Sequence, residues 1–309
     1  MDAIQRLAAD ETLQGFYDCT QQEVLVNNEI FRFKVGSFNC LAVNDRDDWD
    51  CLVLVIDTGQ QRVMIDTGCG DSASPPGRLL ERLQAAGMPA SEVDVVLFSH
   101  ADCDHIGGAV GADGTARLQS GALMAFPRAR YLMSRDEWAF RLTEPVRFRR
   151  EDNTFFDDAF FQWSLDTPVV RLAQLRDKLE FFDDGAEIVP GVRAIAAPGH
   201  TPGMVAIQVS SGAEQLLFIA DMVYGADLHA GAPDGAYDIG TTGVSKWHAF
   251  IDMNPARALV TRDRVFEQAA RQRLLLMAAH TPFPSLGYVS KHGPGWRWEP
   301  WLENFREKR

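Results

Sequence analysis

Short apolar runs rich in β-branched residues alternate with amphipathic segments along most of this chain. In the first half the runs at 31–43, 51–59, 60–68, 91–98 and 129–133 predict strands, and the leucine spacing of 77–86 predicts a helix. In the second half the pattern predicts a helix over 171–178 and strands around 186–197, 204–209 and 215–221, then a helix over 254–272 and a strand over 273–279. This alternation in both halves indicates a layered α/β fold.

The segment 137–165 departs from this alternation because it mixes many aromatic residues with charges. Its aromatic residues include Trp138, Phe140, Phe148, Phe155, Phe156, Phe160, Phe161 and Trp163. Just before it, Ser134 and Glu137 form a capping-box pattern that predicts the start of a helix. The insert is either a helix pair packed on the main fold, or a lid, cleft wall or dimer contact. We favour part core and part cleft wall, which indicates an apolar or aromatic substrate.

Composition narrows the class of protein. The 309 residues are 46% apolar and 24% charged, which is typical of a globular chain, and we expect one domain over 1–309. Asp and Glu outnumber Lys and Arg by 43 to 30, and this net charge of −13 disfavours a nucleic-acid partner. No apolar run approaches the ~18–20 residues of a membrane span. Five scattered cysteines and an acidic N-terminus predict a cytoplasmic protein.

The candidate chemistry lies in histidines and aspartates that follow the predicted strands. Loops at strand ends cluster in space, so these side chains are expected to converge. Imidazoles and carboxylates that converge are the ligands of divalent metal ions. The set comprises His100, Asp102, Asp104, His105, His200, Asp221 and His280.

This pattern resembles the metallo-β-lactamase superfamily, whose signature is His-x-His-x-Asp-His after a strand, followed by a distant His, Asp and His. The segments 64–68 and 198–203 fit the resemblance, and 126–131, 279–289 and 296–298 are similar to the branch with methyl parathion hydrolase and quorum-quenching lactonases. The resemblance implies an α/β (α+β) fold, a four-layer αββα sandwich, and a dinuclear metal hydrolase.

The resemblance also implies a ligand set for two divalent ions, with zinc as the expected metal. One ion would take His100, Asp102 and His200, the other would take Asp104, His105 and His280, and Asp221 would bridge them. Asp102 departs from the family pattern, which has His there. Three aspartates and a bridging hydroxide then offset the charge of two divalent ions. We expect weaker attraction for anions, a less acidic bound water, and a tilt towards manganese, iron or cobalt at the Asp102 site. Alternatively, Asp102 orients another ligand, or its site is empty.

Other residues have supporting interpretations. Asp66 is expected to support a ligand or form a turn, and Cys103 to point into the fold. Tyr224 lies three residues after Asp221, an offset that resembles the lactonases, in which a Tyr hydroxyl contacts the substrate oxygen; the alternative is a packing residue. We expect surface or loop positions for His229, His248 and His292.

The function implied by the resemblance is hydrolysis of a neutral, partly apolar ester or lactone by a hydroxide held between two metal ions. Asp104 or Asp221 would carry the proton, and Tyr224 would donate to the developing oxyanion. Phosphotriester hydrolysis is an alternative, as is a metal-bound ligand sensor or interaction protein with little turnover. The expected partner is a small-molecule substrate, and a homodimer is compatible with the aromatic insert.

Overall fold

The structure is a computed structural model that describes residues 29–111, 116–117, 123–143, 158–224, 228–230, 237–239, 251–293 and 295–301. The first sheet has the strand order β1 (Ile30–Val35), β2 (Phe38–Asn44), β3 (Leu52–Asp57), β4 (Arg62–Ile65), β5 (Val95–Leu97), β8 (Arg130–Ser134) and β9 (Leu179–Phe182). The second sheet has the order β10 (Glu187–Val189), β11 (Val192–Ala196), β12 (Val205–Ser211), β13 (Glu214–Phe218), β16 (Leu275–Met277), β17 (Leu286–His292), β18 (Gly295–Pro300), β15 (Tyr237–Ile239) and β14 (Leu228–Ala230). A short pair joins β6 (Ala116–Arg117) to β7 (Leu123–Met124).

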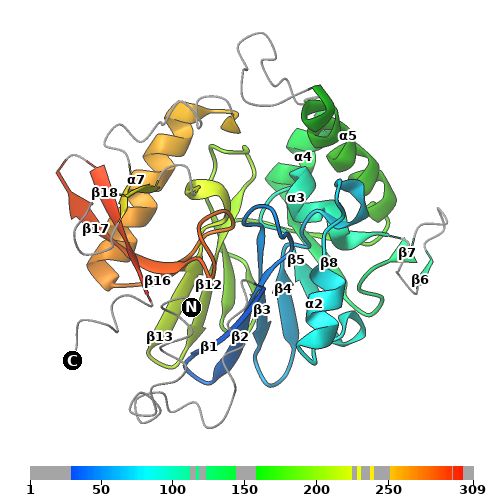
Figure 1. The fold of residues 1–309 in the computed structure, drawn as a ribbon, viewed down its shortest axis with the longest axis horizontal. Coiled ribbons are helices and arrows are strands. Elements are labelled where there is room, and N and C mark those ends of the chain that lie inside the picture. Colours follow the sequence, from blue (N-terminus) through cyan, green and yellow to red (C-terminus); the bar gives the residue numbers. More distant parts are fainter. Residues whose placement is uncertain are drawn as a thin grey trace.

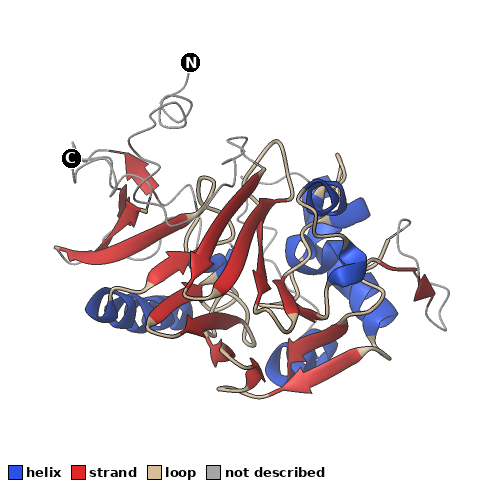
Figure 2. Ribbon diagram, turned by 90° about the horizontal axis from the view of Figure 1, so that it is seen from below, coloured by secondary structure: helices blue, strands red, loops and turns tan. Residues whose placement is uncertain are grey.

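Helices cover the outer faces of these two sheets (Figures 1 and 2). They are α2 (Leu79–Ala85), α3 (Cys103–Ile106), α4 (Arg135–Thr143), α5 (Asp158–Leu175) and α7 (Pro255–Gln272). One apolar cluster joins side chains from both sheets, including Leu54 and Ile207. A second cluster joins the other face of the first sheet, including Val55, to Leu83 of α2 and Leu172 of α5. The expected αββα layering is therefore confirmed.

Several predicted elements match, and three differ for local reasons. α2 and α7 lie within one or two residues of the predicted ranges. The predicted strand 31–43 is a hairpin, because Gly36 has a φ of 57° and turns the chain between β1 and β2. The predicted strand 186–197 is split into β10 and β11, with Gly191 at a φ of 85° in the turn. α5 starts at Asp158, inside the aromatic insert, well before the predicted start.

No helix among the described residues is both long and apolar enough to cross a membrane. The aromatic insert is described only in part. Trp138 of α4 packs against Phe181 with ring centroids 5.3 Å apart, which supports the core interpretation at that end. Phe148, Phe155 and Phe156 lie outside the described residues. The lid, cleft wall and dimer contact stay predictions.

Candidate metal centre

The candidate site lies where parallel strands of both sheets end. β13 and β16 are parallel neighbours, so Asp221 and His280, each three residues beyond the last paired residue, reach the same edge. β4 and β5 are also parallel neighbours, so the segments 66–70 and 99–105 leave the first sheet together. Carboxyl ends of parallel strands share one edge of a sheet, which brings residues distant in sequence to one place.

Three side chains form a group that we call the His280 cluster: Asp104, His105 and His280. The Nε2 atom of His280 lies 3.2 Å from Oδ2 of Asp104 and 3.3 Å from Nε2 of His105. One ligand atom of each residue lies within 4.8 Å of the others, which is close enough for one cation. His105 comes from the short helix α3, whereas His280 follows β16 in the other sheet.

Three further side chains form the Asp102 cluster: His100, Asp102 and His200. Oδ2 of Asp102 lies 3.0 Å from Nε2 of His200 and 3.6 Å from Nε2 of His100. Their ligand atoms also lie within 4.8 Å of one another. Asp102, the residue that replaces the histidine of the family pattern, thus faces the same cavity as the imidazoles.

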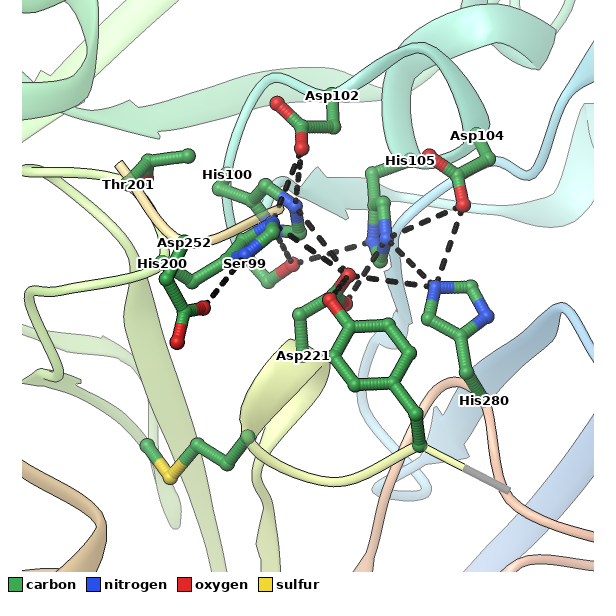
Figure 3. Close-up of polar contacts among 12 residues, drawn as sticks. Ser99, His100, Asp102, Asp104, His105, His200, Thr201, Asp221, Asp252 and His280 are labelled. Carbon is green, nitrogen blue, oxygen red and sulfur yellow. Dashed lines mark hydrogen bonds and ion pairs between the residues drawn. The ribbon is translucent and has the colours of Figure 1, made fainter. Parts of the chain in front are cut away.

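Asp221 lies between the two clusters, and Figure 3 shows the dashed contacts from both sides meeting on its carboxylate. Its Oδ1 lies 3.0 Å from Nε2 of His105, and its Oδ2 lies 3.4 Å from His280, 3.6 Å from His200 and 3.9 Å from His100. The structure therefore brings all seven predicted residues together, with the carboxylate of Asp221 in the shared position.

Asp66 orients two of the imidazoles from outside. Its Oδ2 lies 2.8 Å from Nδ1 of His105 and accepts a hydrogen bond of 2.7 Å from the hydroxyl of Ser99. The Ser99 oxygen is therefore left to accept from Nδ1 of His100, 3.0 Å away. An acceptor at Nδ1 places the proton there and leaves the Nε2 lone pair facing the cavity.

The other two imidazoles are oriented in the same sense. Nδ1 of His200 lies 3.2 Å from Oδ1 of Asp252, and Nδ1 of His280 lies 2.8 Å from the backbone carbonyl oxygen of Asp50. All four imidazoles thus have an outer partner at Nδ1 and present Nε2 inwards. This arrangement is typical of metal-ligating histidines.

Two buried atoms at the centre support a cation. Within the described part of the chain, neither Nε2 of His100 nor Oδ1 of Asp221 has a hydrogen-bond partner, although both atoms are buried. A buried polar group without a partner is costly. Nitrogen and oxygen lone pairs that face one cavity fit a borderline divalent ion such as zinc. The residues present therefore fit the metal pair that the sequence predicts.

The electrostatics point the same way. Burial alone lowers the pKa of an imidazole, yet the surrounding carboxylates raise the pKa of His200 and of His280 to about 10 each. Burial alone raises the pKa of the Asp221 carboxyl, yet His105 and its neighbours hold that pKa well below its usual range. A cavity that favours positive charge on its imidazoles is equally favourable for metal cations.

Tyr224 and Trp49 lie beside the His280 cluster. The Tyr224 hydroxyl donates a hydrogen bond of 2.7 Å to Asp221, and its ring stacks on that of His280 at 5.4 Å. Tyr224 is thus in the site, and burial and Asp221 raise its pKa well above the ordinary value. The Trp49 ring lies 5.4 Å from the His280 ring and is 37% exposed.

The remaining predictions have mixed outcomes. Asp66 is a supporting residue with a φ of 66°, as expected. Cys103 is buried and its thiol pKa is raised well above the ordinary value by burial, which disfavours a thiolate ligand. His292 is exposed at the end of β17. For His229 only the backbone is described, and His248 lies outside the described residues.

Sequence reasoning missed the charged partners behind the Asp102 cluster. Arg141 of α4 donates to the second oxygen of Asp102. Arg262 of α7 donates to both oxygens of Asp252, at 3.1 and 2.8 Å. The sequence contained only a weak signal for Arg141, its i,i+4 spacing from Glu137.

Comparisons with known proteins show what this chain is similar to. A family model described as the metallo-beta-lactamase superfamily matches residues 46–122. The probable metallo-hydrolase Mb2322c of Mycobacterium bovis is 24% identical over 260 residues, which are 75% of this chain and 74% of that protein. The structure of AidC, described as a dizinc quorum-quenching lactonase with a bound product, has a TM-score of 0.71 and 24% identity over 88% of this chain and 97% of AidC.

A second solved structure, the hydrolase AbOPH, described as a member of the beta lactamase superfamily, has a TM-score of 0.68 and 21% identity. Its match covers 88% of this chain and 97% of AbOPH. At these identities the structures establish the fold. The family model adds that residues 46–122, which include His100, Asp102, Asp104 and His105, are similar to the metallo-β-lactamase superfamily.

Proposed function

We propose that this protein is a metallo-hydrolase of the metallo-β-lactamase superfamily, that it holds two divalent metal ions, and that it cleaves a neutral, partly apolar ester or lactone. The observation that carries the proposal is the pair of three-residue clusters on either side of one carboxylate, that of Asp221. The proposed ligands are His100, Asp102 and His200 for one ion and Asp104, His105 and His280 for the other, with Asp221 shared. Zinc is the expected metal, with manganese, iron or cobalt competing at the Asp102 cluster.

When bound, such a pair of ions lowers the pKa of a water molecule towards neutrality and polarises a substrate carbonyl. The protein's own groups then manage the proton and the developing charge. Asp104 and Asp221 face the cavity and are the proposed proton acceptors. Tyr224 stays protonated because its pKa is raised, and its hydroxyl, which donates to Asp221 in this structure, would turn to donate to an oxyanion when substrate is bound.

A neutral and partly apolar substrate is supported by charge and by surface. The carboxylates of Asp102, Asp104 and Asp221, with one hydroxide, offset the four positive charges of two divalent ions, so no excess positive charge attracts an anion. The exposed Trp49 ring beside His280 offers an apolar contact at the same place. AidC, a relative in fold, is described as a lactonase.

The test compares two substrate panels on one preparation. Protein stripped by a chelator and reloaded with zinc, manganese or cobalt is given lactones of increasing acyl length and, separately, neutral phosphotriesters. We expect many turnovers on lactones, loss of turnover on stripping, and recovery on reloading. His105→Ala should remove turnover in a folded protein, whereas His292→Ala, an exposed histidine on β17, should not.

Each other result has a definite meaning. Full activity after thorough stripping would refute a metal-dependent reaction. A clear preference for triesters would keep the metal centre but replace the lactone by a phosphorus ester. Metal and ligand binding without multiple turnovers would instead favour a sensor or interaction protein.

A further inference from the structure

The two carboxylate oxygens of Asp102 have different partners. Oδ2 faces the cavity, 3.0 Å from Nε2 of His200 and 3.6 Å from Nε2 of His100. Oδ1 points away from the cavity and accepts a hydrogen bond from the guanidinium of Arg141. The carboxylate therefore presents one oxygen to a cation, while Arg141 holds the other. Figure 3 shows the inward oxygen with its contacts to the imidazoles.

Arg141 is itself fixed from two sides. Its side chain is 3% exposed, and its Nε donates a hydrogen bond of 3.0 Å to Oε1 of Glu137, one turn earlier in α4. A guanidinium keeps its charge in proteins, and here it lies between the carboxylates of Asp102 and Glu137. A buried arginine between two carboxylates has little freedom to turn away.

Glu137 connects this arginine to both loops that contribute to the Asp102 cluster. Its Oε1 accepts a hydrogen bond of 3.0 Å from the backbone N–H of Ala101, which lies between His100 and Asp102. Its Oε2 accepts one of 2.6 Å from the hydroxyl of Thr201, which follows His200. One fully buried carboxylate thus holds the positions of all three members of the cluster.

The start of α4 packs directly against Gly203, and this close approach, which the contacts of Glu137 require, is possible because Gly203 has no side chain. A Cβ atom on Gly203 would lie 2.0 Å from the backbone nitrogen of Glu137. The hydroxyl of Ser134 donates a hydrogen bond of 2.7 Å to the carbonyl of Gly203 and accepts one of 3.1 Å from the Glu137 N–H. The predicted helix start is therefore correct, but the Glu137 carboxylate is directed to the site.

We propose that Arg141, held by Glu137, is a positioning residue that makes Asp102 a single-oxygen metal ligand. This inference rests on the proposed function, because it requires a metal ion at the Asp102 cluster. An imidazole offers one donor atom inwards and holds its other nitrogen in an outer contact, as the four histidines here do. With Arg141 on Oδ1, Asp102 does the same, and the carboxylate of Glu137 offsets the charge of the guanidinium.

The test measures metal binding in Arg141→Met, which keeps the length of the side chain and removes its charge and donors. We expect one of the two ions to bind about 10–100-fold more weakly, and the other to be unchanged. Competition with a chromophoric chelator gives both affinities, and elemental analysis gives the metal-to-protein ratio. In the cobalt(II) protein, release of Oδ1 raises the coordination number and weakens the visible absorption of one site.

Three further variants make the result specific. Arg82→Met is the matched control, since Arg82 is equally buried in α2 and donates to the carbonyl of Arg46 at 3.1 Å; its metal affinities should match those of the wild type. Arg141→Lys keeps the charge and should recover part of the affinity. In an Asp102→His background, where no carboxylate remains to orient, Arg141→Met should cost no affinity.

Two outcomes would overturn the inference. One is a folded Arg141→Met protein with both affinities and the cobalt spectrum of the wild type. The other is an equal loss of affinity from Arg141→Met with and without Asp102→His. Should Arg141→Met not fold, Arg141→Lys, made both in the wild type and in the Asp102→His background, decides between the same outcomes. A wild-type protein that binds no metal would refute the proposed function instead, so the two failures are distinguishable.

Discussion

The two halves of the proposed metal centre present similar side chains but are supported differently. In the His280 cluster the outer partners are the Asp66 carboxylate and a backbone carbonyl, that of Asp50. In the Asp102 cluster two buried arginines on helices lie behind the ligands, Arg141 on Asp102 and Arg262 on Asp252. The first half is supported by loops at strand ends, and the second by the way α4 and α7 pack.

This difference explains how a carboxylate can occupy a histidine position. A buried carboxylate brings a charge that must be paired, and a loop backbone supplies only neutral groups. The guanidinium of Arg141 supplies that charge, and Glu137 fixes the guanidinium in turn. The Asp102 cluster is thus more dependent on helix packing than the His280 cluster.

The largest effect is expected from removal of Asp221, the residue that both clusters contact. Asp221→Ala should lower kcat/KM by more than about 10³-fold, well beyond the 10–100-fold cost of an outer partner, because both ions lose a ligand. Steady-state kinetics and metal analysis of the reloaded protein test this. Near-normal metal content would show that the two halves do not share Asp221.

Tyr224→Phe tests the group that stands beside the His280 cluster. If its hydroxyl donates to the oxyanion, kcat should fall by about 10²–10³-fold while metal content is unchanged. A fall in metal content with no specific loss of kcat would assign the hydroxyl to Asp221 alone. Parallel kinetics and elemental analysis separate these roles.

The outer carboxylates sharpen the comparison between the two clusters. Asp252→Asn should weaken only the ion held by His200, by about 10–100-fold. Asp66→Asn should weaken both ions, because Asp66 contacts His105 directly and reaches His100 through Ser99. Competition with a chelator measures the affinity for each ion in both variants. If Asp66→Asn, like Asp252→Asn, weakened the binding of one ion only, the proposed difference between the two clusters would be contradicted.

Trp49→Ala should weaken substrate binding beside His280 and leave the metal affinity unchanged. Loss of this exposed ring should raise KM for long-chain lactones by about tenfold, with kcat and metal affinity unchanged. Short-chain lactones serve as the internal control. An equal effect on short and long chains would remove Trp49 from the apolar contact.

The smallest effect concerns the pH dependence of stability, as a shift of a few degrees in Tm. In the metal-free protein, His200 and His280 have a pKa of about 10 against an ordinary 6.5. Their contribution is therefore complete below about pH 6.5 and is lost as pH rises through about 10. Thermal unfolding of stripped protein should show Tm falling over this window, and reloaded protein should show less of a fall. A Tm that rises over this window in stripped protein would contradict the pKa direction.

The convergence of the seven candidate ligands could be predicted from the sequence because each of them follows a predicted strand. His100 to His105 follow β5 of the first sheet, and Asp221 and His280 follow β13 and β16 of the second, so apolar runs in the sequence already place them at strand ends. The layering was predictable for the same reason, since alternating elements must bury their apolar faces in stacked layers. Strand breaks such as Gly36 were harder to predict, because a turn within an apolar run leaves the hydrophobic pattern unbroken.

The sequence by itself thus determined the fold class, the order of the ligands and the departure at Asp102, since these depend on residue type and local position. Only the tertiary structure decided which residues hold Asp102 in place. Arg141 lies 39 residues from Asp102, and Asp252 lies 52 residues from His200. Such contacts depend on where α4 and α7 pack, and the packing of two helices on a loop is a property of the whole chain rather than of any segment.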